Sequence, residues 1–216
     1  MKVRMVALVA AMLLTGCGSG GGLVVGGDKA PHPTTTTLTT LVPRLTPAPW
    51  DRPQDQDAAV RAAGLVLSTS ETLTVHYHSH LDVIIDGKST PVPGGLGINQ
   101  NADGSLPPHG SPGIASLHTH SADGVLHVEA PAAATFTLGQ VFAEWNVALD
   151  RGRVGSYSTS KGDAVAVLTN GVRYLGDPRT VVLKSLQSVV VLVTTKGHRP
   201  VVPPQRYGFA KHGITS

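Results

Sequence analysis

Residues 75–87, "VHYHSHLDVIIDG", combine alternating side chains with the dipeptide Asp86-Gly87. Successive side chains of a β-strand point to opposite faces, so His76, His78 and His80 share one face. The opposite face is apolar except for one serine. Asp-Gly between two such arms is a strong signal for a tight type I′ turn. The stretch therefore predicts a β-hairpin whose first arm directs three imidazoles away from the main core.

A second run, residues 116–129, "SLHTHSADGVLHVE", repeats this pattern, and the two runs hold six of the ten histidines in the chain. A two-residue turn would pair His120 with His127, whereas a four-residue turn would pair His118 with His127. Directly opposed residues lie about 4.5–5.5 Å apart at Cβ, which is close enough for two ligands of one ion. In either register one face carries four candidate ligands: His118, His120, His127 and Glu129.

The remaining segments predict an α+β domain. Residues 55–67 are expected to open with a short helix, and residues 136–149 to form a helix with Thr137 as its N-cap. Residues 94–113 form a long loop, 162–176 a third hairpin turning at Asn170-Gly171, and 187–195 a buried strand. The order hairpin, long loop, hairpin, helix, hairpin, strand indicates a β-rich α+β fold with a β-grasp-like sheet. A β-sandwich with one helix is the alternative.

The N-terminus indicates export. Residues 1–17, "MKVRMVALVAAMLLTGC", have two cations and an apolar run too short to span a bilayer, which is typical of a cleaved signal. Their ending resembles the bacterial lipobox, which implies cleavage after residue 16 and a diacylglyceryl group on Cys17. We therefore expect a lipoprotein anchored to the cell membrane on its extracytoplasmic side. An ordinary secretory signal beside an unpaired cysteine is the alternative.

With this N-terminus, the sequence predicts that the chain has three segments. Residues 1–16 are the expected signal peptide. Residues 17–49 are rich in Gly, Thr and Pro and predict a disordered tether behind the lipidated cysteine. Residues 50–216 are long enough for a single histidine-rich domain with its own core, ending in an irregular tail.

The composition of the mature chain excludes several kinds of partner and site. The formal charge of +3 falls to +1 once Lys2 and Arg4 leave with the signal, and no basic stripe interleaves with aromatic residues. Nucleic acid is therefore not an expected partner. Cys17 is the only cysteine, and all three methionines precede it. A disulfide, a catalytic thiolate and a blue-copper centre are thereby excluded from the domain.

Clustered imidazoles indicate a transition metal, and we expect Cu(II) or Zn(II). Residues four apart on a strand are about 13 Å apart, so His76 and His80 can share an ion only if a bulge bends the strand. In the simpler arrangement, two neighbouring histidines of the first run join those of the second in one centre. In the other, two sites lie side by side along the face. A polar, solvated sheet face without a metal is the plain alternative.

Three stretches carry a family resemblance: "HYHSHLDVIIDGKSTPVPGGLGI", "LHTHSADGVLHVEAP" and "FTLGQVFAEW". They resemble a family of exported prokaryotic proteins of uncharacterised activity over about residues 73–146. At Ser121 the family pattern more often has aspartate, so a carboxylate ligand there would be missing or replaced by Asp123. The resemblance implies that seven residues belong to the family pattern: His76, His78, His80, His118, His120, His127 and Glu129.

The leading hypothesis is a membrane-anchored, extracytoplasmic module that captures, buffers or delivers Cu(II) or Zn(II) through these seven residues. Its expected partners are the metal ion and, through the lipid, the membrane, and no protein partner is indicated. We assign no catalytic residue. A metal-dependent enzyme, either superoxide dismutase-like or a hydrolase with Glu129 as general base, is a second hypothesis. A pH-responsive interaction domain without metal is a third.

Overall fold

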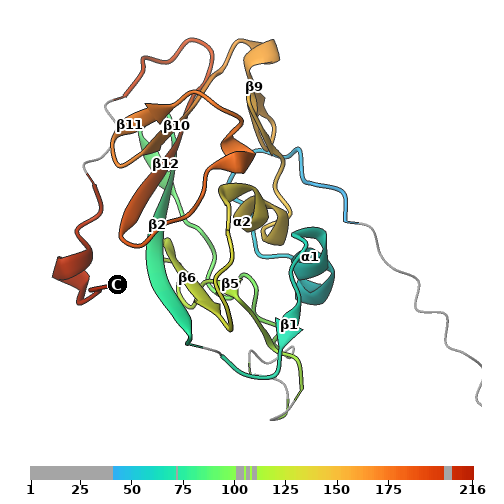
Figure 1. The fold of residues 1–216 in the computed structure, drawn as a ribbon. Helices are drawn as coiled ribbons and strands as arrows, with labels where there is room; N and C mark the ends of the chain where they lie inside the picture. The colour runs from blue at the N-terminus through green and yellow to red at the C-terminus, as the bar shows by residue number, and fades with distance from the viewer. Residues whose placement is uncertain (1–40, 72, 101–104, 106–107, 109–110, 202–205) are drawn as a thin grey trace, which may run out of the picture. The chain divides into compact units, whose positions relative to one another are not determined.

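A computed structural model describes residues 41–216 except 72, 101–104, 106–107, 109–110 and 202–205 (Figure 1). The predicted signal peptide, Cys17 and most of the predicted tether lie outside these residues. The described part of the chain forms two α-helices and twelve strands in three sheets, which confirms the predicted β-rich α+β class. None of its helices is long and apolar enough to cross a membrane.

The largest sheet has the strand order β11-β10-β12-β2-β6-β5, with β3 paired to β2 off this path. Its longest strand, β2, pairs parallel with β12 on one side and antiparallel with β6 on the other. The first and last strands of the sheet therefore lie together at its centre, which is the β-grasp arrangement that the order of elements predicted. These strands are β2 (Val75–Ile85), β3 (Lys88–Thr90), β5 (Leu117–His118), β6 (Val125–Ala130), β10 (Ala164–Thr169), β11 (Val172–Tyr174) and β12 (Gln187–Thr194).

Two small sheets and three short 3₁₀ helices complete the described elements. The two-stranded sheet pairs β1 (Leu67–Ser68) with β4 (Ile114–Ala115). The three-stranded sheet has β7 (Leu149–Asp150), β8 (Arg153–Val154) and β9 (Tyr157–Ser158). The 3₁₀ helices are η1 (Thr159–Lys161), η2 (Pro178–Thr180) and η3 (Phe209–His212).

The predicted hairpin turns are confirmed. Asp86 and Gly87 have φ of 49° and 81° between β2 and β3, and Asn170 and Gly171 have φ of 50° and 82° between β10 and β11. A type I′ turn requires positive φ at both central residues, and Asp, Asn and Gly tolerate it best. In the hairpin of β5 and β6, His118 stands opposite His127, which is the register of the longer turn.

Both predicted helices form: α1 (Gln56–Ala62) opens residues 55–67 as a short helix, as expected, whereas α2 (Leu138–Glu144) ends earlier than its apolar pattern indicated. In α2 the Thr137 side chain caps the first turn, and Gln140 returns a bond to the cap residue. The helix ends before residue 149 because Asn146 adopts a φ of 54°, in the left-handed region that terminates helices. In α1 Asp55 is the N-cap, and Gly64 with a φ of 70° follows the helix end.

The main core lies between α2 and the adjacent face of the large sheet (Figure 1). The residues buried there include Leu81, Val83, Leu126, Val128, Leu138, Val141, Phe142, Trp145, Val189 and Val191. The apolar face of β2 is thus the core face, as its alternation predicted. The histidines of β2 point to the other side of the sheet.

Residues just before position 50 also belong to this packing, although the sequence placed them in the tether. The main-chain N–H of Arg44 donates to Asn146 O at 2.8 Å. Trp50 is only 3% exposed and lies edge-to-face on Trp145, whose indole N–H donates to Trp50 O. The chain therefore joins the domain by residue 44, because a main-chain hydrogen bond and a buried indole hold it there.

The C-terminal tail covers part of the histidine face of β2. Figure 1 shows the chain end beside this strand, on the side away from α2. The Tyr207 ring stacks on the His80 ring at 3.7 Å, and Ser216 O accepts a hydrogen bond from His78 N at 3.1 Å. His80 is consequently only 4% exposed. The histidine face is therefore partly buried by the tail.

The glycine-rich residues 94–97 pack against β5 and the residue that follows it. Gly95 N donates to Thr119 O, and Thr119 N donates back to Leu96 O. Gly97 has a φ of 70°, and a Cβ placed on it would lie 2.3 Å from Leu117 O. Only glycine permits this approach, and the segment leaves His118 only 1% exposed.

We expect Gly97→Ala to lower the free energy of unfolding more than Gly171→Ala. Both glycines have positive φ, 70° and 82°, so alanine carries a similar backbone cost of about 1–2 kcal/mol at each. Nothing lies within 4 Å of a Cβ at Gly171, whereas a Cβ at Gly97 meets a main-chain oxygen. Urea denaturation of the two variants measures the difference. Equal losses would show that the Gly97 segment does not press on β5.

Candidate metal centre

Three neighbouring strands each place one histidine in a row across the sheet. His78 of β2 stands opposite His127 of β6, and His127 stands opposite His118 of β5. Neighbouring strands are about 4.7–4.9 Å apart, so the middle imidazole can reach either neighbour. The two histidine-rich runs therefore direct their rings into one common region.

The hydrogen-bond pattern brings the rings on β2 and β6 particularly close. His78 N donates to Ser216 O, and His78 O accepts from Leu186 N at 2.7 Å, so both groups face away from β6. His78 and His127 therefore form a non-hydrogen-bonded pair, in which opposed side chains approach most closely. Their ring centroids are 4.6 Å apart and the planes are nearly perpendicular.

Four side chains form what we call the inner cluster: His118, His120, His127 and Glu129. One ligand atom from each lies within 4.8 Å of the others. The Nε2 atoms of His118 and His120 are 3.2 Å apart. Two nitrogens bound to one tetrahedral zinc lie about 3.3–3.4 Å apart, so this pair could bind one ion with little movement.

The orientation of the His118 ring is fixed by its other nitrogen. Its Nδ1–H donates to Ala115 O at 2.9 Å, which leaves the lone pair on Nε2. Metal-binding histidines commonly donate their second nitrogen to a carbonyl or carboxylate in this way, which sets the tautomer and the ring direction. His118 is thus oriented as a ligand toward His120.

Glu129 lies between the histidines with an unsatisfied oxygen. Its Oε1 is 3.6 Å from His76 Nε2 and 3.8 Å from His127 Nδ1. Its Oε2 is buried and accepts no hydrogen bond from any described residue. Burial raises the pKa of Glu129, and the charge of Glu71 raises it further. A bound cation would satisfy this oxygen and favour the ionised carboxylate.

Burial also keeps two of the imidazoles neutral. Desolvation lowers the pKa of His118 to about 4 and that of His127 to about 3, and the surrounding histidines add to both effects. A neutral imidazole retains the lone pair that a metal needs. These two rings are therefore in the ligand form at neutral pH.

A second group, the outer cluster, consists of His76, His78 and His127. It also brings one nitrogen from each residue within 4.8 Å of the others. His76 is exposed, whereas His78 and His127 are partly buried. The two clusters share His127, and together they contain six of the seven residues that the sequence nominated.

The seventh nominated residue, His80, lies apart from both clusters. Its Nε2 is 2.9 Å from Asp123 O, and its Nδ1 is 3.4 Å from Asp82 Oδ2. Tyr207 covers its ring. His80 therefore contacts the tail and the β5–β6 turn instead of joining the row of imidazoles.

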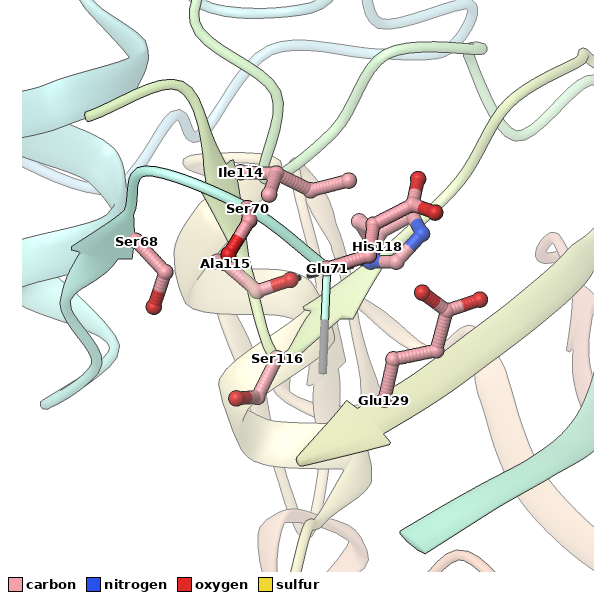
Figure 2. A pocket seen from close by; sticks show the side chains of 8 residues that line it. All are labelled: Ser68, Ser70, Glu71, Ile114, Ala115, Ser116, His118 and Glu129. Atoms are coloured by element: carbon pink, nitrogen blue, oxygen red, sulfur yellow. Dashed lines mark hydrogen bonds between the residues drawn. The ribbon is translucent and has the colours of Figure 1, made fainter. Parts of the chain in front are cut away.

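Glu71 is a neighbour of the centre that the sequence reasoning missed. A small polar pocket beside the inner cluster is lined by Ser68, Ser70, Glu71, Ile114, Ala115, Ser116, His118 and Glu129. Figure 2 shows the carboxylates of Glu71 and Glu129 reaching toward the His118 ring from different segments. Glu71 precedes β2 without a recognisable motif, so no local pattern could have found it.

Comparison of the chain with models of protein families, with curated proteins and with solved structures gave no match. The chemistry of the centre is therefore inferred from its own geometry.

Below about pH 6.5 we expect metal-free protein to lose stability steadily as the pH falls toward 4. In this window the unfolded chain protonates His118 and His127 at their ordinary pKa of 6.5, whereas the folded protein, with both pKa values lowered, does not. The unfolded state then binds more protons, so acid favours unfolding. Urea denaturation in the presence of a chelator at pH 7 and pH 5 measures the effect.

The His118→Gln variant isolates this contribution, because glutamine does not titrate. Its stability should fall less between pH 7 and pH 5 than that of the original chain. An identical fall in both proteins would contradict the assignment of the pH dependence to this site.

Proposed function

We propose that the protein is a membrane-anchored, extracytoplasmic module that binds Cu(II) or Zn(II) for capture, buffering or delivery. The observation that carries the proposal is the inner cluster, in which three imidazoles and a carboxylate from β5, β6 and their connection bring their donor atoms within 4.8 Å of one another. Such a donor set suits borderline divalent ions, and it contains no sulfur that would favour Cu(I).

Four protein donors favour binding over catalysis. A catalytic zinc site commonly has three protein ligands and keeps one position for water or substrate, whereas a site with four protein ligands is closed. The inner cluster offers four donors. The enzyme hypothesis therefore has less support from the geometry than the binding hypothesis.

Exchange of the ion is supported by the uneven burial of the ligands. His118 and Glu129 are buried, while His120 is exposed on the connection after β5. An exposed ligand can leave the ion first and let another donor replace it, while the buried ligands keep their positions. This arrangement suits a protein that takes up and releases an ion rather than one that holds it permanently.

The proposed location depends on the N-terminal sequence. The apolar run, the Leu-Thr-Gly-Cys ending and the Gly/Thr/Pro-rich stretch behind it fit a lipid anchor followed by a spacer. Two or more acyl chains hold a protein stably at a bilayer. The domain would then meet ions arriving at the outer side of the cell membrane.

We expect the full-length protein, stripped with a chelator, to bind Zn(II) tightly at the inner cluster and to gain thermal stability from it. His120→Ala should weaken this binding at least about 100-fold, since even changes outside the ligand shell commonly cost 10–100-fold. Isothermal titration and thermal unfolding with Zn(II) measure both effects.

His198→Ala is the matched control, because His198 is an exposed histidine that bonds to Thr195 and belongs to neither cluster. It should bind Zn(II) as the original chain does. Failure of the original protein to bind Zn(II) or Cu(II) tightly would contradict the proposed function.

We also expect Cys17→Ser to release the protein from membranes, because serine cannot form the thioether that carries the diacylglyceryl group. Phase partitioning in detergent and mass measurement of the N-terminal peptide test this, with Ser19→Ala as the neighbouring control. A Cys17→Ser protein that remained in the detergent phase would refute the lipid anchor.

A further inference from the structure

The inner cluster leaves two histidines without a role in it. A tetrahedral ion takes four donors, and His118, His120, His127 and Glu129 already supply four. His76 and His78 remain on β2, with ring centroids 4.8 Å apart. Together with His127 they bring three nitrogens within 4.8 Å of one another. Exposure of a strand face to solvent does not explain why three imidazoles converge there.

The His78 ring is oriented in the same manner as His118. Its Nδ1 is hydrogen-bonded to the main-chain oxygen of Ser216, as His118 Nδ1 is to Ala115 O. In both rings Nε2 is therefore the nitrogen left for an ion. Two rings on opposite sides of His127 are thus each held for ligation by a main-chain oxygen.

His127 lies between these rings. Its ring is 4.6 Å from His78 and 4.4 Å from His120, nearly perpendicular to both. An imidazole has two nitrogens, and when both bind metal the ring has released its N–H proton and carries a negative charge. His127 is therefore the one residue that can serve both clusters at once.

We propose a second metal position formed by His76, His78 and His127, with the His127 ring shared between two ions, one nitrogen to each. This inference rests on the proposed function, because it presumes an ion in the inner cluster. Loading of the second ion transfers the remaining ring proton of His127 to solvent. The exposed side at His76 leaves the fourth position to water or a small anion, so the second position suits Cu(II) or Zn(II).

The charges around the shared ring oppose the repulsion between two cations. The imidazolate of His127 is anionic, and Glu129 Oε1 lies 3.6 Å from His76 Nε2. The charge of Glu71 also acts on Glu129. These three negative groups would reduce the repulsion between two dications.

The stoichiometry of Cu(II) binding tests the second position. Full-length protein stripped with a chelator should bind two Cu(II) ions per chain at neutral pH. His78→Ala should bind one, and His198→Ala should still bind two. One Cu(II) ion in the original chain overturns this inference but leaves the proposed function standing, whereas tight binding of neither Cu(II) nor Zn(II) overturns the proposed function itself.

Electron paramagnetic resonance tests the shared ring without a variant at His127, which could fail to fold. Two Cu(II) ions joined by one imidazolate couple their unpaired electrons, so the doubly loaded protein should give less signal than two isolated ions. His78→Ala with one ion should give the full signal of an isolated ion. Two bound ions with the full signal of two isolated ions would overturn the sharing of His127.

Discussion

β2 and β6 pair in a register that sets His78 opposite His127 and His76 opposite Glu129. A slip of one residue would turn every one of these side chains toward α2 and bring the apolar residues of both strands to the other face. The core residues, such as Leu81 and Val128, prevent such a slip because their burial would be lost. The hydrophobic core on one face of the sheet therefore maintains the arrangement of imidazoles on the other.

Much of the fold could be predicted from the sequence because its signals are local. Asp86-Gly87 and Asn170-Gly171 specify turns through backbone conformations that few residues tolerate, and Thr137 specifies a helix start through its side chain. The length of α2 could not be predicted as well, because one left-handed residue, Asn146, ends the helix inside an apolar pattern that continues beyond it. Propensity alone does not reveal such a conformation.

The candidate centre was predictable to the extent that strand alternation determines side-chain direction. Alternation placed six of the nominated residues in two clusters, and the choice of register between β5 and β6 followed only from the structure. His80 stacks on Tyr207 of the tail, and the charge of Glu71 acts on Glu129 of β6. Both roles therefore depend on segments that are distant in sequence. Such contacts leave no trace in the local pattern, because they arise only when the whole sheet has formed.

The parallel pairing of β2 with β12 has a consequence for folding. Ser79 Oγ donates to Lys184 O, 105 residues further along the chain, so the centre of the sheet joins segments that are far apart in sequence. Closing so long a loop costs chain entropy before any contact compensates for it, and folds rich in such contacts form slowly. The half of the sheet that carries the imidazoles pairs much nearer neighbours. We therefore expect β5 and β6 to pair with β2 before β12 does, so that the two histidine clusters form before the sheet is complete.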